Sequence, residues 1–396
     1  MKQPQQRLYS IDVFRAVTMF LMIFVNDFDG VQNVPEWMKH AKASEDALGF
    51  ADIIFPAFLF ILGLSIPIAM QNRIKRGQTE DRLLLYILLR SFALLLMGVF
   101  QVNLENYSNA SLLPRPVWEI IITLAFFLIW IDYSNNVKKQ TRYLLQTIGV
   151  ALLIAMAIVY KGENAQHSLQ PLQPQWYGIL GLLGWSYFIC APLYLLSKGK
   201  VWTCLISWAF FFLFSVVTKA EMLDGLGPVR HYIWIVGSGS MPAFTMAGVV
   251  VFVMYKKLVA DNKMNQLWLV LTLFGLLNIA LGFFTRPLGG ISKIHDTPSW
   301  IGFCTGISVL AFVFAIYLVD VKQKKAWFNI IKPAGTVTLV CYLIPYILYS
   351  LFEVFHLHFP LFLNEGWGGF FRSVVTSLLV IQFAGWLEKR QIRLKI

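Results

Sequence analysis

The stretch FADIIFPAFLFILGLSIPIAM, residues 50–70, decides the fold class of this chain. Asp52 is the only ionisable side chain in this otherwise apolar run. A helix needs about 20 mostly apolar residues to cross the hydrocarbon core of a bilayer. The stretch therefore predicts a membrane-spanning helix.

Apolar runs of similar length recur along the whole chain, so the sequence predicts an all-α, polytopic transmembrane helix bundle of about twelve spans. The run at 241–257 is short and follows a Gly-Ser-Gly-Ser segment, so it could be broken or re-entrant, and ten or eleven spans remain open. The runs lie near residues 8–28, 50–70, 83–103, 116–134, 143–160, 176–197, 201–219, 241–257, 266–285, 299–320, 331–353 and 369–388.

The composition agrees with lipid as the main solvent of the chain. Hydrophobic residues make up 57% of the sequence and charged residues 14%, whereas soluble domains carry about 25% charged residues. The net charge of +12 does not indicate a nucleic-acid partner, because the basic residues occupy short loops between apolar runs rather than one patch.

The distribution of Lys and Arg predicts the topology. With the N-terminus inside, every internal loop is basic, which favours an even number of spans and two cytoplasmic termini. The first run holds Asp12 and Arg15 and no small-residue cleavage motif follows it, so we expect it to stay as a helix rather than act as a cleaved signal. We expect one integral membrane domain over residues 1–396 that crosses the membrane several times.

No metal site is expected. The four cysteines fall inside apolar runs without CxxC spacing, which predicts neither a disulfide nor a zinc site. His356 and His358 form an H-x-H pair that lacks an evident third ligand.

Ionisable side chains inside predicted spans are the main functional signal, because they are costly in lipid and mark functional sites by default. They are Asp12, Arg15, Asp52, Arg90, Glu119, Lys332 and Arg372.

The first predicted helix carries a polar stripe. Arg15 and Asn26 are eleven residues apart and share a helix face, and Asp12 lies one turn before Arg15. The stripe is roughly 16 Å long. It is either a ligand-tunnel lining or an Asp12–Arg15 pair that only orients the helix.

His40 lies in the loop that follows this helix, between Asn26 and Asp52 in sequence. A histidine can take a proton from an amine or hydroxyl, a nearby carboxylate can hold its tautomer, and an amide can donate to an oxyanion. The other interpretation is a solvated loop histidine.

Four motifs in the first hairpin resemble the heparan-alpha-glucosaminide N-acetyltransferase family. They are RLYSIDVFR (7–15), FVN (24–26), WMKH (37–40) and FADIIFPAFLFILG (50–63), and their order and approximate spacing agree with the family over residues 7–70. KPAGTVTLVCY (332–342) is similar to a late helix of bacterial relatives. The resemblance implies a bacterial-type transmembrane acyltransferase, multi-pass in the inner (cytoplasmic) membrane and without the luminal domain of the animal enzyme. It also implies that residues 7–70 form the catalytic hairpin.

The resemblance also implies roles for named residues. His40 maps to the family's catalytic histidine, Asn26 to its active-site asparagine and Asp52 to the acidic residue of the next helix. The implied donor is acetyl-CoA and the implied acceptor a sugar or amino sugar. Candidate contacts for coenzyme A, some of them cations suited to its phosphates, are Arg7, Asp12, Arg15 and Arg90.

Two other classes of protein remain open at this point. A secondary transporter of a small polar or sugar-like solute would explain the even span count and the buried charges. A non-catalytic membrane protein would need no placed His–Asn–Asp set. The acceptor, N- versus O-acetylation, an acetyl-histidine intermediate versus direct transfer, and homodimer formation also stay open.

Overall fold

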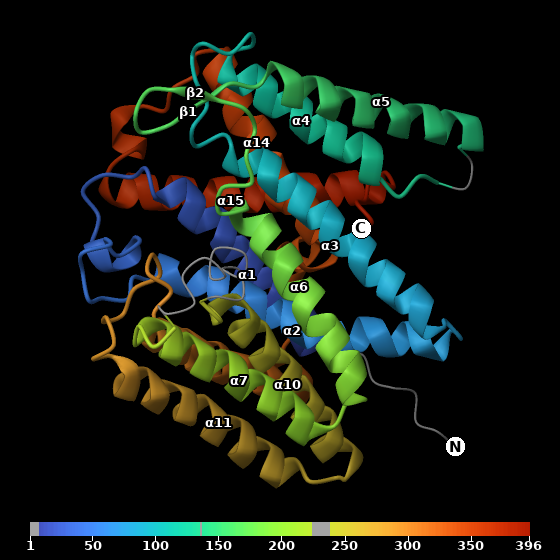
Figure 1. Cartoon of the computed structure of the whole chain (residues 1–396), viewed down its shortest axis with the longest axis vertical. Helices are drawn as coiled ribbons and strands as arrows, with labels where there is room; N and C mark the ends of the chain where they lie inside the picture. The colour runs from blue at the N-terminus through green and yellow to red at the C-terminus, as the bar shows by residue number, and fades with distance from the viewer. Residues whose placement is uncertain (1–7, 135–136, 224–237) are drawn as a thin grey trace. The chain divides into compact units, whose positions relative to one another are not determined.

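The computed structural model describes residues 8–134, 137–223 and 238–396, and it confirms the all-α, polytopic prediction (Figure 1). The α-helices are α1 (Tyr9–Phe28), α2 (Ala51–Lys75), α3 (Glu80–Val102), α4 (Arg115–Trp130), α5 (Lys139–Val159), α6 (Gly178–Ser197), α7 (Val201–Lys219), α10 (Ser240–Ala260), α11 (Met264–Thr285), α12 (Pro298–Ala315), α13 (Lys332–Thr336), α14 (Thr338–Val354) and α15 (Gly366–Lys389). Short helical segments are η1 (Glu36–Met38), η3 (Ile316–Val321), η4 (Ala326–Ile330) and η5 (Leu361–Leu363), and the strands are β1 (Gly162–Glu163) and β2 (Leu169–Gln170).

Each predicted apolar run contains a helix. Within the described residues, nine helices are long and apolar enough to cross a membrane, and α14 is a shorter apolar helix. The chain is therefore a multi-pass membrane protein.

Two runs differ from the prediction. The option that the run at 241–257 is broken is wrong, because α10 is continuous over Ser240–Ala260 and begins directly after Gly239, which has a φ of 68°. The run at 331–353 is the one that is interrupted. Val337, at φ −122° and ψ 47°, separates α13 from α14.

The chain divides into two compact units, each built from segments that are distant in sequence. Within the described residues, the first unit comprises 8–18, 34–88, 185–223 and 238–329, and the second comprises 19–33, 89–134, 137–184 and 330–396.

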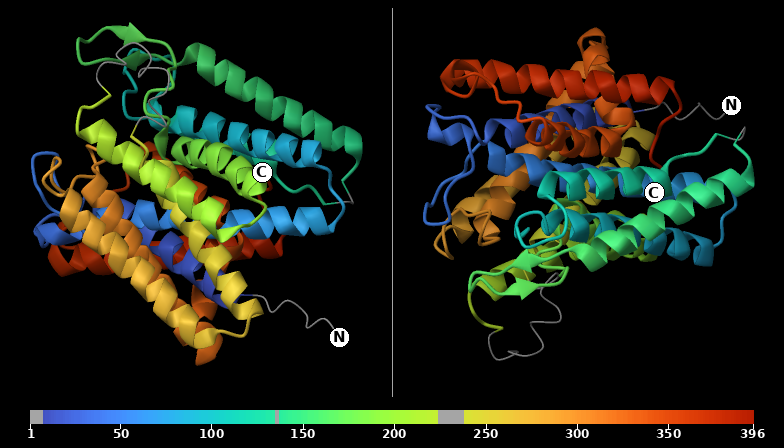
Figure 2. Two further views of the ribbon diagram at one scale, coloured as in Figure 1. Left: turned by 60° about the horizontal axis from the view of Figure 1, so that its bottom comes forward. Right: turned by 90° about the horizontal axis from the view of Figure 1, so that it is seen from above.

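In the first unit, α10 packs against α2, α7 and α11, and α12 packs against α2 and α11 (Figure 2). The α2–α10 contact is close because glycines face each other. A Cβ at Gly63 would lie 1.9 Å from the carbonyl oxygen of Thr245, and one at Gly248 would lie 2.0 Å from that of Phe60. Small residues are the usual means of close helix approach in membranes. This packing supports the N-terminal end of α2, where Asp52 lies.

In the second unit, α4 and α5 lie side by side (Figure 1), α14 packs on α4, and α15 contacts α13 and α14. The antiparallel strands β1 and β2 pair Gly162 with Gln170 and Glu163 with Leu169. Tyr107 extends this ladder with a bridge to Gly162. The hairpin thereby fixes the loops at one end of α3, α5 and α6.

Candidate functional site

The loop between α1 and α2 brings His40 to Asp52. Nδ1 of His40 lies 2.6 Å from Oδ1 of Asp52. The Asp52 side chain is 3% exposed and the His40 side chain is 34% exposed. The pair therefore joins a buried carboxylate to a ring that a ligand can reach.

The Asp52 carboxylate is fixed by the loop itself. Its Oδ2 accepts hydrogen bonds from the backbone N–H groups of Ala41, at 3.0 Å, and Gly49, at 3.1 Å. The loop closes tightly here, since a Cβ at Gly49 would lie 2.0 Å from the carbonyl oxygen of Lys39. Asp52 also lies in the first turn of α2, where the helix dipole favours negative charge.

This geometry assigns the tautomer of His40. An ionised carboxylate only accepts hydrogen bonds, so Nδ1 carries the hydrogen and donates it to Asp52. The lone pair of the neutral ring is then on Nε2. A histidine held in this way can take a proton at Nε2 while Asp52 stabilises the resulting imidazolium.

Two residues that are far from the α1–α2 loop in sequence complete the surroundings of the His40–Asp52 pair. They were not predicted from the sequence. The indole Nε1 of Trp300 donates to the carbonyl oxygen of Asp52 at 3.2 Å. The Lys293 ammonium lies 3.3 Å from Nδ1 of His40 and within electrostatic range of Asp52. Because Nδ1 already donates to Asp52, Lys293 contributes a positive charge beside the carboxylate.

Asp46 joins the α1–α2 loop to the loop that carries Lys293. Its Oδ1 accepts the N–H of Ile291 at 2.7 Å, and its Oδ2 lies 2.9 Å from Nε of Arg286. The backbone N–H of Ile291 and the Arg286 guanidinium hold the pKa of Asp46 below its ordinary value. This contact positions the loop that carries Lys293.

The other predicted site residues are placed as follows. Arg15 Nη1 lies 3.4 Å from Asp12 Oδ1, and Arg15 Nη2 donates to Ser65 Oγ on α2 at 2.8 Å. The Asp12–Arg15 contact is compatible with both the tunnel-lining and the helix-orienting interpretation. Asn26 belongs to the second unit, where its side chain is exposed, and Arg90 is half-buried on α3 in the same unit. Arg7 lies outside the described residues.

A buried ion pair beside Asn26 was not predicted. Arg372 on α15 donates through Nη2 to the carboxylate of Asp27 at 3.2 Å and to its carbonyl oxygen at 3.1 Å. The hydroxyl of Tyr349 also donates to this carboxylate. Arg372 is an isolated charge in the sequence pattern, and its partner is 345 residues away.

The fold and the His40–Asp52 pair define a multi-pass membrane protein with a histidine–carboxylate site. The family model described as "Domain of unknown function (DUF5009)" matches residues 7–222, more than half of the chain. The chain belongs to this family.

The chain is also similar to two curated proteins that are named as acetyltransferases. The chain is 43% identical over 101 residues to heparan-alpha-glucosaminide N-acetyltransferase from Homo sapiens, a similarity that spans 26% of this chain and 14% of the human protein. It is 40% identical over 106 residues to the protein of the same name from Mus musculus, which spans 27% of this chain and 15% of that protein. The resemblance drawn from the first hairpin is confirmed.

Proposed function

We propose that this protein is a transmembrane acetyltransferase that moves an acetyl group from cytoplasmic acetyl-CoA to a sugar or amino-sugar acceptor on the outer side of the inner membrane. The observation that carries the proposal is the His40–Asp52 pair, whose half-exposed ring has Nε2 available for a proton. The names of the similar human and mouse proteins support acetyl transfer as the reaction.

The reaction assigns each atom a destination. The acceptor nitrogen or oxygen attacks the thioester carbonyl carbon, and Nε2 of His40 takes the proton that the acceptor loses. The carbon–sulfur bond then breaks, and the coenzyme A thiolate leaves and takes up the proton from His40, which gives the thiol and restores the neutral ring. Direct transfer in a ternary complex fits this role of His40 as general base.

Asp52, Asn26 and Lys293 have supporting roles in this proposal. Asp52 orients the ring and stabilises the imidazolium. Asn26 donates to the thioester carbonyl oxygen as negative charge develops on it. Lys293 adds a positive charge beside the His40–Asp52 pair.

The polar stripe of α1 suits the donor. Coenzyme A carries phosphates that lipid does not solvate, so its nucleotide stays at the basic cytoplasmic face while the pantetheine arm reaches inward. In this proposal Arg15, which contacts Asp12 and Ser65 of α2, lies along this path, and Arg7 and Arg90 are further candidate contacts.

Replacement of His40 by alanine tests the proposal. His40→Ala should stay folded and bind coenzyme A, because the loop is held by Asp46 and by the Asp52 backbone contacts rather than by the ring. Its single-turnover transfer from acetyl-CoA should fall about 10²–10⁴-fold, the usual contribution of a general base.

His358→Ala is the matched control, because this histidine is exposed and lies outside the site. It should transfer at the wild-type rate. A folded His40→Ala protein with normal turnover would remove His40 from catalysis. The absence of acetyl transfer by the wild type to any amino sugar or sugar would favour a secondary transporter instead.

A further inference from the structure

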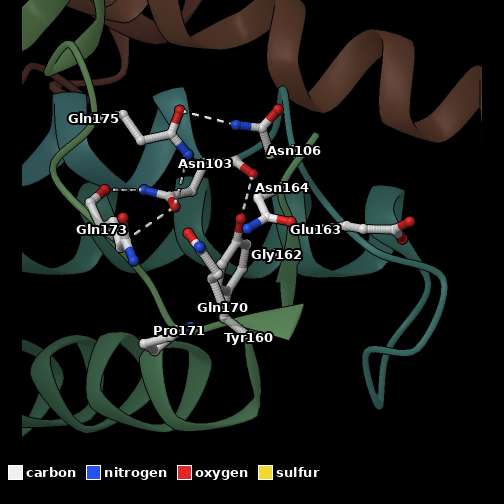
Figure 3. Close-up of a pocket in the computed structure, with 10 residues that line it drawn as sticks. All are labelled: Asn103, Asn106, Tyr160, Gly162, Glu163, Asn164, Gln170, Pro171, Gln173 and Gln175. Atoms are coloured by element: carbon white, nitrogen blue, oxygen red, sulfur yellow. Dashed lines mark hydrogen bonds between the residues drawn. The ribbon is translucent and has the colours of Figure 1, made fainter. Parts of the chain in front are cut away.

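A pocket of about 260 Å³ opens among the loops of the second unit, next to the β1–β2 hairpin (Figure 3). It is lined by Asn103, Asn106, Tyr160, Gly162, Glu163, Asn164, Gln170, Pro171, Gln173 and Gln175. Six of these ten residues carry a carboxamide. The volume is just below the roughly 300 Å³ at which sites for drug-sized ligands begin, so it suits a compact ligand.

The floor of the pocket is Asn103, which is 1% exposed. Its Nδ2 donates to the carbonyl oxygens of Val99 and Gln173, each at 2.6 Å. Its Oδ1 accepts from the backbone N–H of Gln173 at 3.2 Å and from Nε2 of Gln175 at 3.4 Å. One buried amide thus fixes the segment 173–175 against the end of α3.

Two further contacts make the walls rigid before any ligand binds. Nδ2 of Asn106 donates to Oε1 of Gln175 at 3.1 Å, and the Tyr160 hydroxyl donates to the carbonyl oxygen of Asn103 at 2.9 Å. The hairpin adds the hydrogen bond from the Glu163 N–H to the carbonyl oxygen of Asn106, at 2.8 Å. Figure 3 shows these groups converging from three loop segments.

The carboxamides of Gln170 and Gln173 are the groups left for a ligand. Across the described part of the chain, neither side-chain amide is engaged in a hydrogen bond, and both residues reach the surface. Each carboxamide offers two donors and an acceptor in one plane, which matches neighbouring hydroxyl groups that both donate and accept.

The charge of the pocket narrows the ligand class. Among the described residues that line the pocket, Glu163 is the only charged one. Hydrogen bonds from His167 and Ser108 hold the pKa of this carboxyl below its ordinary value, so it is negative at neutral pH. In Figure 3 its side chain points away from the amide cluster. The amide cluster itself therefore carries no charge among the described residues, and its neutral carboxamides suit an uncharged polyhydroxylated ring better than an anion.

We propose that this pocket binds a neutral sugar ring, at a site that is separate in sequence from the His40–Asp52 pair and needs no acetyl donor. The proposal does not depend on the transferase activity. In the topology predicted from the basic loops, the pocket is on the outer side, where carbohydrate is encountered.

Binding of sugars to the full-length protein in nanodiscs, measured by saturation-transfer NMR and by titration with each sugar in the absence of acetyl-CoA, tests the proposal. Glucose and N-acetylglucosamine are the neutral probes, and glucuronate is the anionic probe of similar size. The neutral sugars should bind, and glucuronate should bind at least tenfold more weakly. His40→Ala should bind them like the wild type.

The double variant Gln170→Ala/Gln173→Ala should weaken binding at least about fivefold, because it removes two hydrogen-bonding groups that hold no part of the wall. Gln166→Ala, in the turn between β1 and β2 but outside the lining, is the matched control and should leave binding unchanged. Absence of binding by both neutral sugars, equal binding of glucuronate, or undiminished binding in the folded double variant would overturn the proposal. None of these outcomes bears on acetyl transfer, which is measured separately.

Discussion

Two carboxylates of the first hairpin are equally buried but are surrounded very differently. The side chains of Asp27 and Asp52 are each 3% exposed. Asp27 faces Arg372, which is 11% exposed, whereas Asp52 faces His40, which is 34% exposed. Arginine keeps its charge throughout the physiological range, whereas histidine gains and loses a proton near neutral pH.

The comparison teaches that burial of a carboxylate is not by itself a sign of catalysis. Asp27, Arg372 and Tyr349 form a closed set in which the acid and its partner are both withdrawn from solvent. The Asp52 pair has a closed side, where backbone N–H groups hold the acid, and an open side at the histidine ring. We therefore infer that the first set holds the fold and that the second performs chemistry.

The largest expected effect on stability is at the closed set. Arg372→Ala leaves Asp27 buried without a compensating charge, and loss of one partner of a buried pair costs about 3–5 kcal/mol. Thermal unfolding in detergent should show this loss. Arg393→Ala breaks a half-exposed pair with Glu388 at 3.5 Å and is the control, with an expected cost of at most about 1 kcal/mol. Equal unfolding temperatures for the two variants would remove the structural role of the Asp27–Arg372 pair.

An intermediate effect is expected at Arg15. If its guanidinium contacts a coenzyme A phosphate, Arg15→Ala should weaken binding by about 1.5–3 kcal/mol, the worth of a hydrogen bond to a charged group. Calorimetry on the folded variant measures this, with the exposed Arg76→Ala as control. Unchanged affinity would favour the interpretation in which the Asp12–Arg15 pair only orients α1.

The smallest effect is expected at Asp46, whose pair with Arg286 is half-exposed. Asp46→Asn should reduce the free energy of unfolding by about 0.2–1 kcal/mol at neutral pH. Because folding lowers the pKa of Asp46, its contribution is complete above the ordinary value of about 3.9 and disappears as the pH falls through the lowered pKa. Unfolding curves of both proteins between pH 7 and acid should converge. A difference that grew in acid would contradict the assignment.

Local pattern predicted much of this molecule. Hydropathy located a helix in every predicted run, and the hairpin motifs placed His40 beside Asp52. The sequence did not reveal Lys293 or Trp300, because these residues meet the pair only through the packing of α12 on α2, some 250 positions later. Arg372 was recognised as a costly charge, but its partner Asp27 could not be identified from helical periodicity, which relates only near neighbours.

The interruptions of helices were also not predicted correctly from local sequence patterns. The glycines and serines before α10 left open a break that does not exist, because Gly239 takes a positive φ just before the helix and leaves the rest intact. The break at Val337 follows Gly335 by two residues and Pro333 by one turn, but neither residue led to its prediction. These details depend on what each helix packs against.

The most direct test of the account is the single-turnover acetyl-transfer rate of Asp52→Asn. The asparagine carbonyl oxygen can still accept from Ala41 and Gly49, which turns its NH₂ group toward His40. Nδ1 must then accept a hydrogen bond, so the proton moves to Nε2 and the base is lost. The account predicts a folded protein that binds coenzyme A and transfers acetyl at least about 100-fold more slowly than the wild type. A folded Asp52→Asn protein with the wild-type rate would contradict it.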